Sequence, residues 1–234
     1  MAWRLPAGLN IIDSIDPKLA GLGVRVGLLI VEGVNVRERS SRLDEEIERI
    51  VNLVKERIGS LEALREHPYV KAYRSFLWRL GIDPTKTRPS SEALARRVLR
   101  GSPLPRVNNI VDAGNASSLL HMVPIGLYDL DRLRPPVRLT LCREPCIFEP
   151  IGGKPRLLKP GTPVLVDSSG YVIHVYPHRD ARKTAINEGT RRLLAVSAGV
   201  MGVEESSLRE SLEDFARLLE VDGLTPRLGE VTIV

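Results

Sequence analysis

Hydrophobic positions recur every three or four residues between Ser41 and Gly59, which is the period of a helix. The apolar residues that share this face are Leu43, Ile47, Ile50, Val51, Val54 and Ile58. Ser41 is the expected N-cap, with Asp44 three residues later, and Gly59 is the expected end. The pattern therefore predicts an amphipathic helix that packs one face against a core.

A second helical pattern follows and ends at Gly81. Its apolar face carries Val70, Tyr73, Phe76, Leu77 and Leu80. Before both helices, the run VRVGLLIVEGV from Val24 is short, β-branched and nearly continuous. Such a run is typical of a buried strand.

Two more helices begin at polar residues. RPSSEALARRVLRG has an expected cap at Ser90 or Ser91, and Glu92 lies where the helix dipole favours an acid. The next helix starts at Asn108 or Asn109 and continues to about residue 120. The first half of the chain is therefore mainly helical.

After residue 135 the apolar period changes to two. VRLTLC alternates cleanly, VLVDSSGYVIHV reads as a hairpin around Asp-Ser-Ser-Gly, and RRLLAVSAGV is a further strand. A last helix has Ser207 and Glu210 as its expected capping box, and EVTIV is the expected closing strand. Helices in the first half and strands in the second predict an α+β fold, and we expect residues 1–234 to form one compact domain.

The composition is that of an ordinary globular protein, with 43% apolar and 27% charged residues. Residues 1–10 contain no long apolar region that would act as a signal peptide. The longest apolar run is too short to cross a bilayer. We therefore expect a soluble cytoplasmic protein with no membrane partner. The chain has 27 Arg, 7 Lys and no Gln, which is compatible with a thermophilic source.

A formal charge of +5 and a pI of about 9.4 permit a polyanionic partner. The basic residues gather at Arg96, Arg97 and Arg100, and again at Arg179, Arg182, Lys183, Arg191 and Arg192. Tyr171 and Tyr176 lie near the second cluster, and cations with interleaved aromatics suit RNA. Dipole compensation explains the first cluster equally well, and a solvated loop explains the second.

The two cysteines lie in the segment CREPC. Reduced thiols are the expectation for a cytosolic protein, and a local disulfide around a turn is the alternative in a heat-adapted one. A third interpretation joins Cys142 and Cys146 to His174 and His178 as zinc ligands, at spacings outside the usual finger pattern. The chain contains none of the standard phosphate-loop, dinucleotide or zinc-protease motifs, so no cofactor or metal is expected.

The segment RVNNIVDAGNASSLLHMVPIGLYDLD, residues 106–131, combines short polar side chains with residues that favour burial. Asn108 or Asn109 is a helix cap, and Asp112 and Asn115 then lie on one face of that helix. These side chains either fix loop backbone within the core or form the polar wall of a small ligand pocket. The residues alone leave both interpretations open.

The same segment resembles the B3/B4 (tRNA-binding) domain of the phenylalanyl-tRNA synthetase beta subunit. The family pattern V-D-x-x-N-x-x-x-L-x-x-x-x-P-x-x-x-x-D-L-D-x-[IL] is matched by Val111, Asp112, Asn115, Leu119, Pro124, Asp129, Leu130, Asp131 and Leu133. Upstream, GIDPTK, RPSSEALARRVLRG and PRVN resemble freestanding B3/B4 proteins. Downstream, the R-D-x-x-x-T-x-[IV]-x-x-x-T pattern is matched by Arg179, Asp180, Thr184, Ile186 and Thr190. The resemblance covers residues 65–200, with 1–60 as an N-terminal extension and 201–234 as a C-terminal helix and strand.

This resemblance implies a layered α+β domain with a β-sandwich-like core and flanking helices. In the synthetase the domain is the editing module, which hydrolyses the ester of a mischarged tRNA. A freestanding copy is then expected to act on aminoacyl-tRNA in trans and to have tRNA, or a synthetase, as partner. The alternatives are a non-catalytic RNA-binding module and a pocket for a free amino acid.

The site residues expected from the resemblance and from the local chemistry fall into three groups. The aminoacyl pocket comprises Asn108, Asn109, Asp112, Asn115, Ser118 and Gly126. The RNA-binding set comprises Arg97, Arg106, Arg179, Arg182 and Lys183. The structural set comprises Ser91, Glu92, Pro124, Asp129, Asp131, Thr184 and Thr190.

One position departs from the family. Bacterial synthetase domains have a histidine two residues after the motif proline, and this chain has Gly126 there. Those proteins also have a downstream acid in the editing pocket, for which the sequence offers no aligned counterpart. The resemblance therefore assigns no catalytic residue. An aminoacyl ester is labile, so a site that positions water and the ribose hydroxyl is sufficient for hydrolysis.

Overall fold

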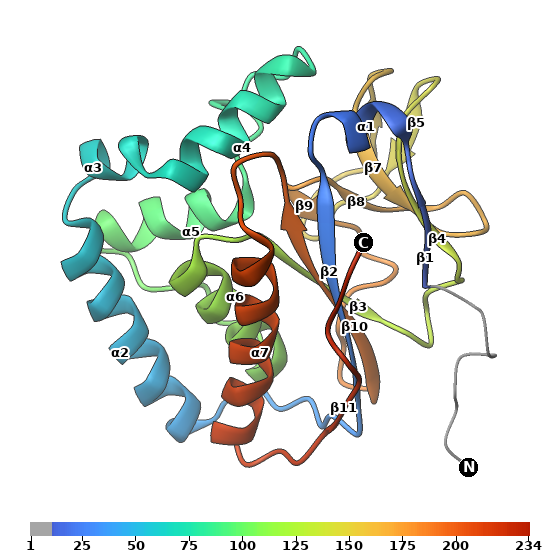
Figure 1. The fold of residues 1–234 in the computed structure, drawn as a ribbon. Coiled ribbons are helices and arrows are strands. Elements are labelled where there is room, and N and C mark those ends of the chain that lie inside the picture. Colours follow the sequence, from blue (N-terminus) through green and yellow to red (C-terminus); the bar gives the residue numbers. More distant parts are fainter. Residues whose placement is uncertain (1–10) are drawn as a thin grey trace.

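The computed structural model describes residues 11–234 (Figure 1). The expectation that residues 1–10 hold no signal peptide lies outside this range. The described helices are α1 (Pro17–Gly21), α2 (Ser41–Ile58), α3 (Leu61–Glu66), α4 (Pro68–Arg79), α5 (Ser90–Leu99), α6 (Asn109–His121) and α7 (Glu205–Val221). None of these helices is long and apolar enough to span a membrane.

The strands form two five-stranded sheets and a hairpin. Sheet A has the order β1 (Ile12–Ile15), β4 (Val137–Leu141), β7 (Pro163–Val166), β8 (Val172–Val175) and β9 (Arg179–Asp180). Sheet B has the order β11 (Arg227–Leu228), β2 (Arg25–Glu32), β10 (Arg192–Gly199) and β3 (Ile125–Asp129), with β12 (Thr232–Ile233) also paired to β2. The separate hairpin is β5 (Cys146–Phe148) with β6 (Arg156–Leu158).

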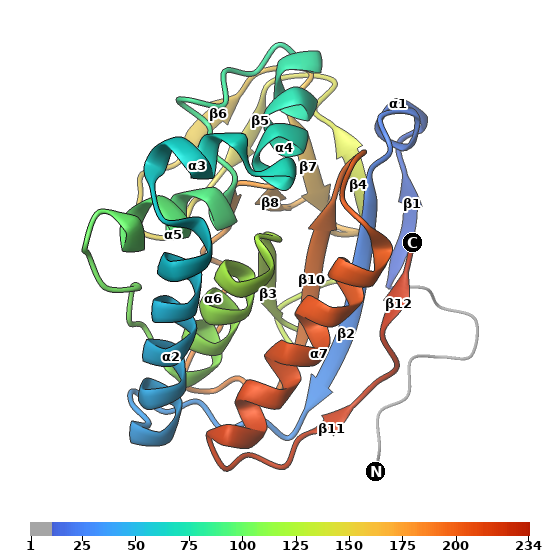
Figure 2. The ribbon, with the colours of Figure 1, turned by 60° about the vertical axis from the view of Figure 1, so that its left-hand side comes forward.

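The elements stack as layers, with α2, α5, α6 and α7 on one face of sheet B and sheet A on the other, and α1 lies on the side of sheet A (Figure 1). Figure 2 shows α7 running along β2 and β10. The α+β expectation with a sandwich-like core is confirmed. Sheet A is in turn covered by the β5–β6 hairpin, which packs Phe148 and Leu158 against Val164 and Val175.

The central strand β10 pairs with β2 along one edge and β3 along the other, and its residues are buried on both faces of the sheet. Alternate residues of a strand point to opposite faces. Leu193 and Ala195 accordingly enter the core shared with the helices, whereas Leu194 and Val196 enter the core shared with sheet A. Sheet B therefore divides the interior into a helix-side core and an inter-sheet core.

The helix ends correct three sequence predictions by a few residues. The N-cap of α2 is Ser40, whose Oγ accepts a hydrogen bond from Leu43 N, and not Ser41. Pro89 occupies the N-cap of α5, so neither Ser90 nor Ser91 caps it. The N-cap of α7 is Glu204, which moves Ser207 and Glu210 into the helix and makes the capping box wrong. Helix ends depend on tertiary contacts that a local motif does not contain.

Ser91 and Glu92 lie in the first turn of α5, where Glu92 was predicted, and both are buried. The Glu92 carboxylate accepts two hydrogen bonds from Arg74, at 3.0 and 2.6 Å, and lies 3.3 Å from Arg88 Nε. Arg74 belongs to α4 and Arg88 to the turn before α5, so this carboxylate joins three segments. A buried charge of this kind is tolerated because it is paired on both sides.

We expect Glu92→Ala to lower the free energy of unfolding by about 3 kcal/mol, because it leaves two guanidinium groups without their counter-charge. Glu92→Gln retains an acceptor and is expected to cost less. Glu46→Ala, which removes a partner from the exposed Arg49, serves as the control and is expected to cost under about 1 kcal/mol. Urea unfolding of the three variants measures this. Equal losses in Glu92→Ala and Glu46→Ala would contradict the assignment.

His67 caps α4, and its Nδ1 accepts a hydrogen bond from Tyr69 N at 3.2 Å. Burial, with a smaller contribution from the charge on Arg57, lowers the pKa of His67 below its ordinary value. The pKa of His178 is also lowered, chiefly by burial. The unfolded chain therefore binds these protons more tightly than the folded chain does, and stability is lost as the pH falls below about 6.5.

We expect the urea midpoint of the wild type to fall between pH 7.5 and pH 5.5. Asparagine is a strong N-cap that does not titrate, so His67→Asn is expected to match the wild type at pH 7.5 and to lose less at pH 5.5. His67→Ala, which removes both cap and titration, separates the two effects. The interpretation fails if His67→Asn shows the full wild-type drop.

Candidate functional site

The polar residues at the start of α6 hold neighbouring segments in place. The Asn108 side chain accepts a hydrogen bond from Val111 N at 2.9 Å and caps the helix, as predicted. Asn109 accepts from Arg37 N at 2.8 Å and donates to the Asp222 carboxylate at 2.6 Å. Asn109 therefore attaches the loop before α2 and the end of α7 to α6, whereas Asn108 acts within α6.

Asp112 and Arg106 extend this network. Asp112 Oδ1 accepts a hydrogen bond from Val107 N at 2.8 Å, and Arg106 Nη1 lies 3.6 Å from Asp112 Oδ2. Arg106 also pairs with Asp44 in α2. Burial raises the pKa of Asp112, against the opposing effects of the Val107 amide and the Arg106 charge. Arg106, expected to bind RNA, is thus occupied by two carboxylates within the protein.

The structure does not bring the six expected pocket residues together. Gly114 packs closely on Leu127, so this face of α6 lies on the helix side of sheet B. Ser118, one turn later on that face, has a buried Oγ without a hydrogen-bond partner among residues 11–234, and Asn115 is half-buried on the same helix. Gly126, one residue before Leu127 in β3, faces the other way, into the inter-sheet core. Sheet B separates it from the five polar residues.

Gly126 lies beside a cluster of polar side chains inside the sandwich. Tyr128, two residues along β3, donates a hydrogen bond to Asp180 Oδ1 at 2.9 Å. His174 Nδ1 lies 2.7 Å from the same oxygen. A Cβ at position 126 would overlap the Tyr128 hydroxyl and lie 3.1 Å from Asp180 Oδ1. The tyrosine hydroxyl therefore occupies the space that a side chain at this position would need.

This cluster is buried at one end and open at the other. Tyr128 is 1% exposed, while the Asp180 side chain retains 24% of its surface. Burial and the Asp180 charge raise the pKa of Tyr128 well above its ordinary value, so the phenol remains a donor. Within residues 11–234, Asp180 Oδ2 forms no hydrogen bond. An acceptor oxygen at a partly exposed carboxylate, beside an oriented imidazole, is suited to holding and polarising a water molecule.

Asp180, His174 and Tyr128 were not identified as site residues from the sequence. The available signal was the R-D pair of the downstream motif, because Asp180 is part of it. Its relation to Gly126 depends on the antiparallel pairing of His174 with Asp180 across β8 and β9. It also depends on the stacking of two sheets, which a single sequence does not specify.

The residues of the structural set connect the two family motifs. Asp129 Oδ2 accepts hydrogen bonds from Thr190 Oγ1 at 2.8 Å and Asn187 Nδ2 at 2.9 Å, and Asp129 Oδ1 accepts from Asp131 N at 2.9 Å. Asp131 pairs with Arg192. Asp129 N donates to Thr184 O, and Ala198 N donates to Pro124 O. The D-L-D turn is thereby fixed to the loop that follows β9.

Positive charge is concentrated in the sheet A half of the chain. Residues 132–183 contain ten Lys or Arg and four Asp or Glu, a formal charge of +6, whereas the remainder has 24 against 25. Arg179, Arg182 and Lys183 are exposed here, and Lys183 lies 4.7 Å from the centre of the Tyr171 ring. Arg97, by contrast, donates to Pro103 O on the helical side. The basic side chains near Asp180 thus form a surface that attracts polyanions.

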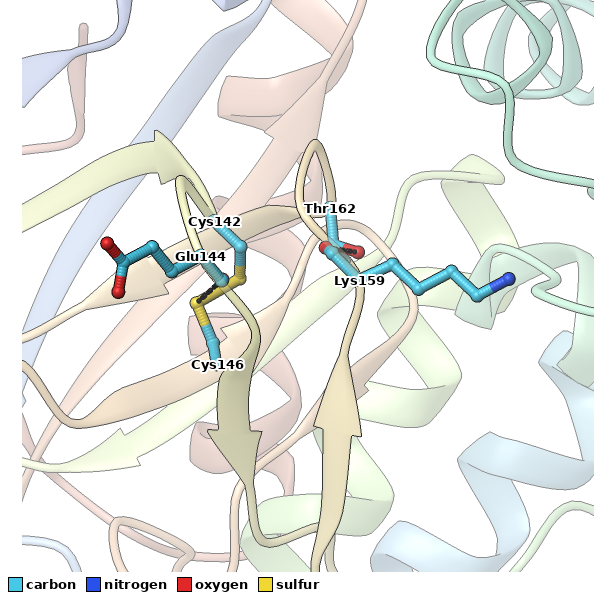
Figure 3. Close-up of a disulfide and its surroundings, with 5 residues drawn as sticks. All are labelled: Cys142, Glu144, Cys146, Lys159 and Thr162. Atoms are coloured by element: carbon cyan, nitrogen blue, oxygen red, sulfur yellow. Dashed lines mark hydrogen bonds between the residues drawn. A yellow bond between two sulfur atoms is a disulfide. The ribbon is translucent and has the colours of Figure 1, made fainter.

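The zinc interpretation is wrong for the described chain. Cys142 and Cys146 form a disulfide at the base of the β5–β6 hairpin, so the expectation of reduced thiols is also wrong (Figure 3). His174 is bound to Asp180, and His178 Nδ1 lies 2.7 Å from Arg88 O. Residues 11–234 contain no group of three potential metal ligands.

We expect Gly126→Ala to lower the free energy of unfolding by about 1–3 kcal/mol, because the new methyl group displaces the Tyr128 ring. The loss is expected to shrink in a Tyr128→Phe background, since the hydroxyl is the nearest obstructing atom. A double-mutant cycle by urea unfolding measures the coupling. Strictly additive losses would show that the two positions do not share space.

The model of the family described as the B3/4 domain matches residues 72–224. A search of curated protein sequences finds no match. An N-terminal fragment of the phenylalanyl-tRNA synthetase beta subunit from Pyrococcus horikoshii aligns with 92% of this chain and 49% of its own, at 15% identity and a TM-score of 0.48. The chain thus spans about half of that fragment. Because the family model covers well over half of the sequence, this chain belongs to the B3/4 domain family.

Proposed function

We propose that this protein binds tRNA and hydrolyses mischarged aminoacyl-tRNA in trans. The observation that carries the proposal is the Tyr128–Asp180–His174 cluster, in which a partly exposed carboxylate lies beside Gly126 and next to exposed cations. The family's editing domains have a histidine at the position of Gly126 and an acid nearby. Asp180 supplies the acid here, and His174 supplies an imidazole from a different strand.

The cluster has the arrangement needed to activate water. His174 Nδ1 faces a carboxylate, so this nitrogen carries the proton and Nε2 is left as the acceptor. Water attacks the ester carbonyl carbon while His174 Nε2 takes its proton. The carbonyl–oxygen bond to the ribose then breaks, and the ribose oxygen receives the proton. The products are free amino acid and uncharged tRNA.

The surrounding cations supply the second part of the function. Arg179 and Arg182 are exposed and flank Asp180 closely in sequence, and Arg179 is held by a hydrogen bond to Ile151 O. Phosphates of the tRNA acceptor end would be bound at this surface, which directs the terminal ester toward Asp180. Discrimination between amino acids would then follow from the space that Gly126 and Tyr128 leave.

A deacylation assay on a panel of mischarged tRNAs tests the proposal. We expect ester cleavage above the buffer rate by the wild type, and a loss of about 100-fold in His174→Gln, because general-base catalysis contributes on this scale. Asp180→Asn is expected to lose at least about tenfold, and both variants are expected to bind tRNA like the wild type.

The chain offers a matched control in a second histidine–aspartate pair. His121 Nε2 lies 2.6 Å from Asp214 Oδ2 on the helical side, far from the basic surface. His121→Gln is expected to leave cleavage unchanged. Binding of tRNA without cleavage of any ester would support a non-catalytic RNA-binding module instead. Thermal stabilisation by a free amino acid, with no affinity for tRNA, would support an amino-acid pocket and end the proposal.

A further inference from the structure

A groove of about 470 Å³ lies between the turn that follows α4 and the outer strand of the hairpin. One wall is the G-I-D-P-T-K motif, which contributes Asp83, Lys86 and Thr87. The other wall runs from Arg156 to Thr162 and contributes Lys159. The G-I-D-P-T-K motif is characteristic of the family, and none of its residues belongs to the cluster at Gly126.

The groove is positively charged. Lys86 and Lys159 form no ion pair with another residue of 11–234, and Arg156 lies over the Phe148 ring, which orients the guanidinium without neutralising it. Asp83 is occupied, because its Oδ1 accepts hydrogen bonds from Thr85 N at 2.8 Å and Thr85 Oγ1 at 2.7 Å. These bonds lower the pKa of Asp83 and keep it ionised, so the lining has three cations and one anion.

The wall from Arg156 to Thr162 is held by hydrogen bonds to a disulfide-bonded turn. The Cys142–Cys146 disulfide lies at the base of the hairpin. Cys142 O accepts a hydrogen bond from Gly161 N at 2.8 Å, and Cys142 N donates to Thr162 O at 2.9 Å. Thr162 Oγ1 donates to Lys159 O at 2.7 Å, and the Lys159 side chain extends away from the disulfide (Figure 3). The cations of this wall are thereby presented from fixed backbone, which limits the entropy lost on binding.

The groove and the candidate site lie on opposite faces of β8 in sheet A. Val175 lines the groove, and the preceding residue of β8 is His174, which faces the opposite side of sheet A. The motif wall is tied to the same region, because Arg88 O accepts from His178 and Ser90 N donates to Pro177 O at 3.2 Å. Val175 in the groove pairs with Arg179 of β9, so the groove adjoins the strand that carries Asp180.

We propose that this groove binds phosphodiester groups of an RNA strand through Lys86, Arg156 and Lys159, with the hydroxyl of Thr87 as a further donor. Point charges and hydroxyls without exposed aromatic rings in the lining suit phosphate and give no means of reading bases. This inference rests on the RNA partner of the proposed function and assigns it a second contact, distinct from Arg179 and Arg182.

The test is the salt dependence of binding of a labelled, uncharged tRNA pool, followed by fluorescence anisotropy. We expect Lys86→Ala/Lys159→Ala to weaken binding about tenfold or more and to reduce the slope of log K against log salt by about 1–2, because each phosphate contact contributes about 0.7–0.9. Lys55→Ala/Lys71→Ala removes the same charge from α2 and α4 and is expected to change affinity less than about twofold. Thermal melting verifies that all variants fold.

Equal slopes in the two double variants would overturn the proposal. A second result would also overturn it. If Lys86→Ala/Lys159→Ala loses binding of inorganic phosphate but keeps the wild-type affinity for tRNA, the groove is a site for a free anion. A wild type that binds no tRNA overturns the proposal as well. Cleavage of mischarged tRNA with an unaffected salt slope would reject the groove and leave the hydrolase. A reduced slope without any cleavage would support the groove and reject the hydrolase.

Discussion

Sheet B has to bury both of its faces, and the rest of the structure is arranged around this requirement. Its central strand β10 places Leu193 against the helices and Leu194 against sheet A. Any polar group in either core must therefore find a partner inside the protein. On the helix side Asn109 does so by binding backbone of a distant loop. On the other side Tyr128 does so by binding Asp180.

These two solutions have different chemical consequences. The side-chain oxygen and nitrogen of Asn109 both form hydrogen bonds within the protein. Asn109 therefore stabilises the fold and is not available to bind a ligand. Asp180 remains partly exposed, and its carboxylate has one oxygen to spare after binding Tyr128 and His174 within the described chain. The family signature thus contains residues that assemble the domain, whereas the residues suited to chemistry come from strands further along the chain.

The predicted elements agree with the structure where they depend on residues that are close together in the sequence. The cap at Asn108 and the β7–β8 hairpin depend on residues within a few positions, and both are present. The residues predicted to form one pocket are divided, because sheet B lies between Gly126 in β3 and Asn108, Asn109, Asp112, Asn115 and Ser118 on α6. The cluster at Asp180 required knowledge of how two sheets stack. The disulfide spans only the turn between β4 and β5, and it confirms the alternative of a local disulfide that the sequence had left open.

The overlap between position 126 and the Tyr128 hydroxyl also constrains how this site can change over time. A histidine at 126, as the bacterial synthetase domains have, requires the tyrosine to be lost or moved first. A protein with Tyr128 has the hydrogen bond to Asp180. A single substitution at position 126 cannot then introduce a histidine, because the Tyr128 hydroxyl occupies the space. An intermediate that carries both the histidine and the tyrosine has a crowded core, and one that carries neither has a cavity. Each form of the site is therefore expected to persist once established.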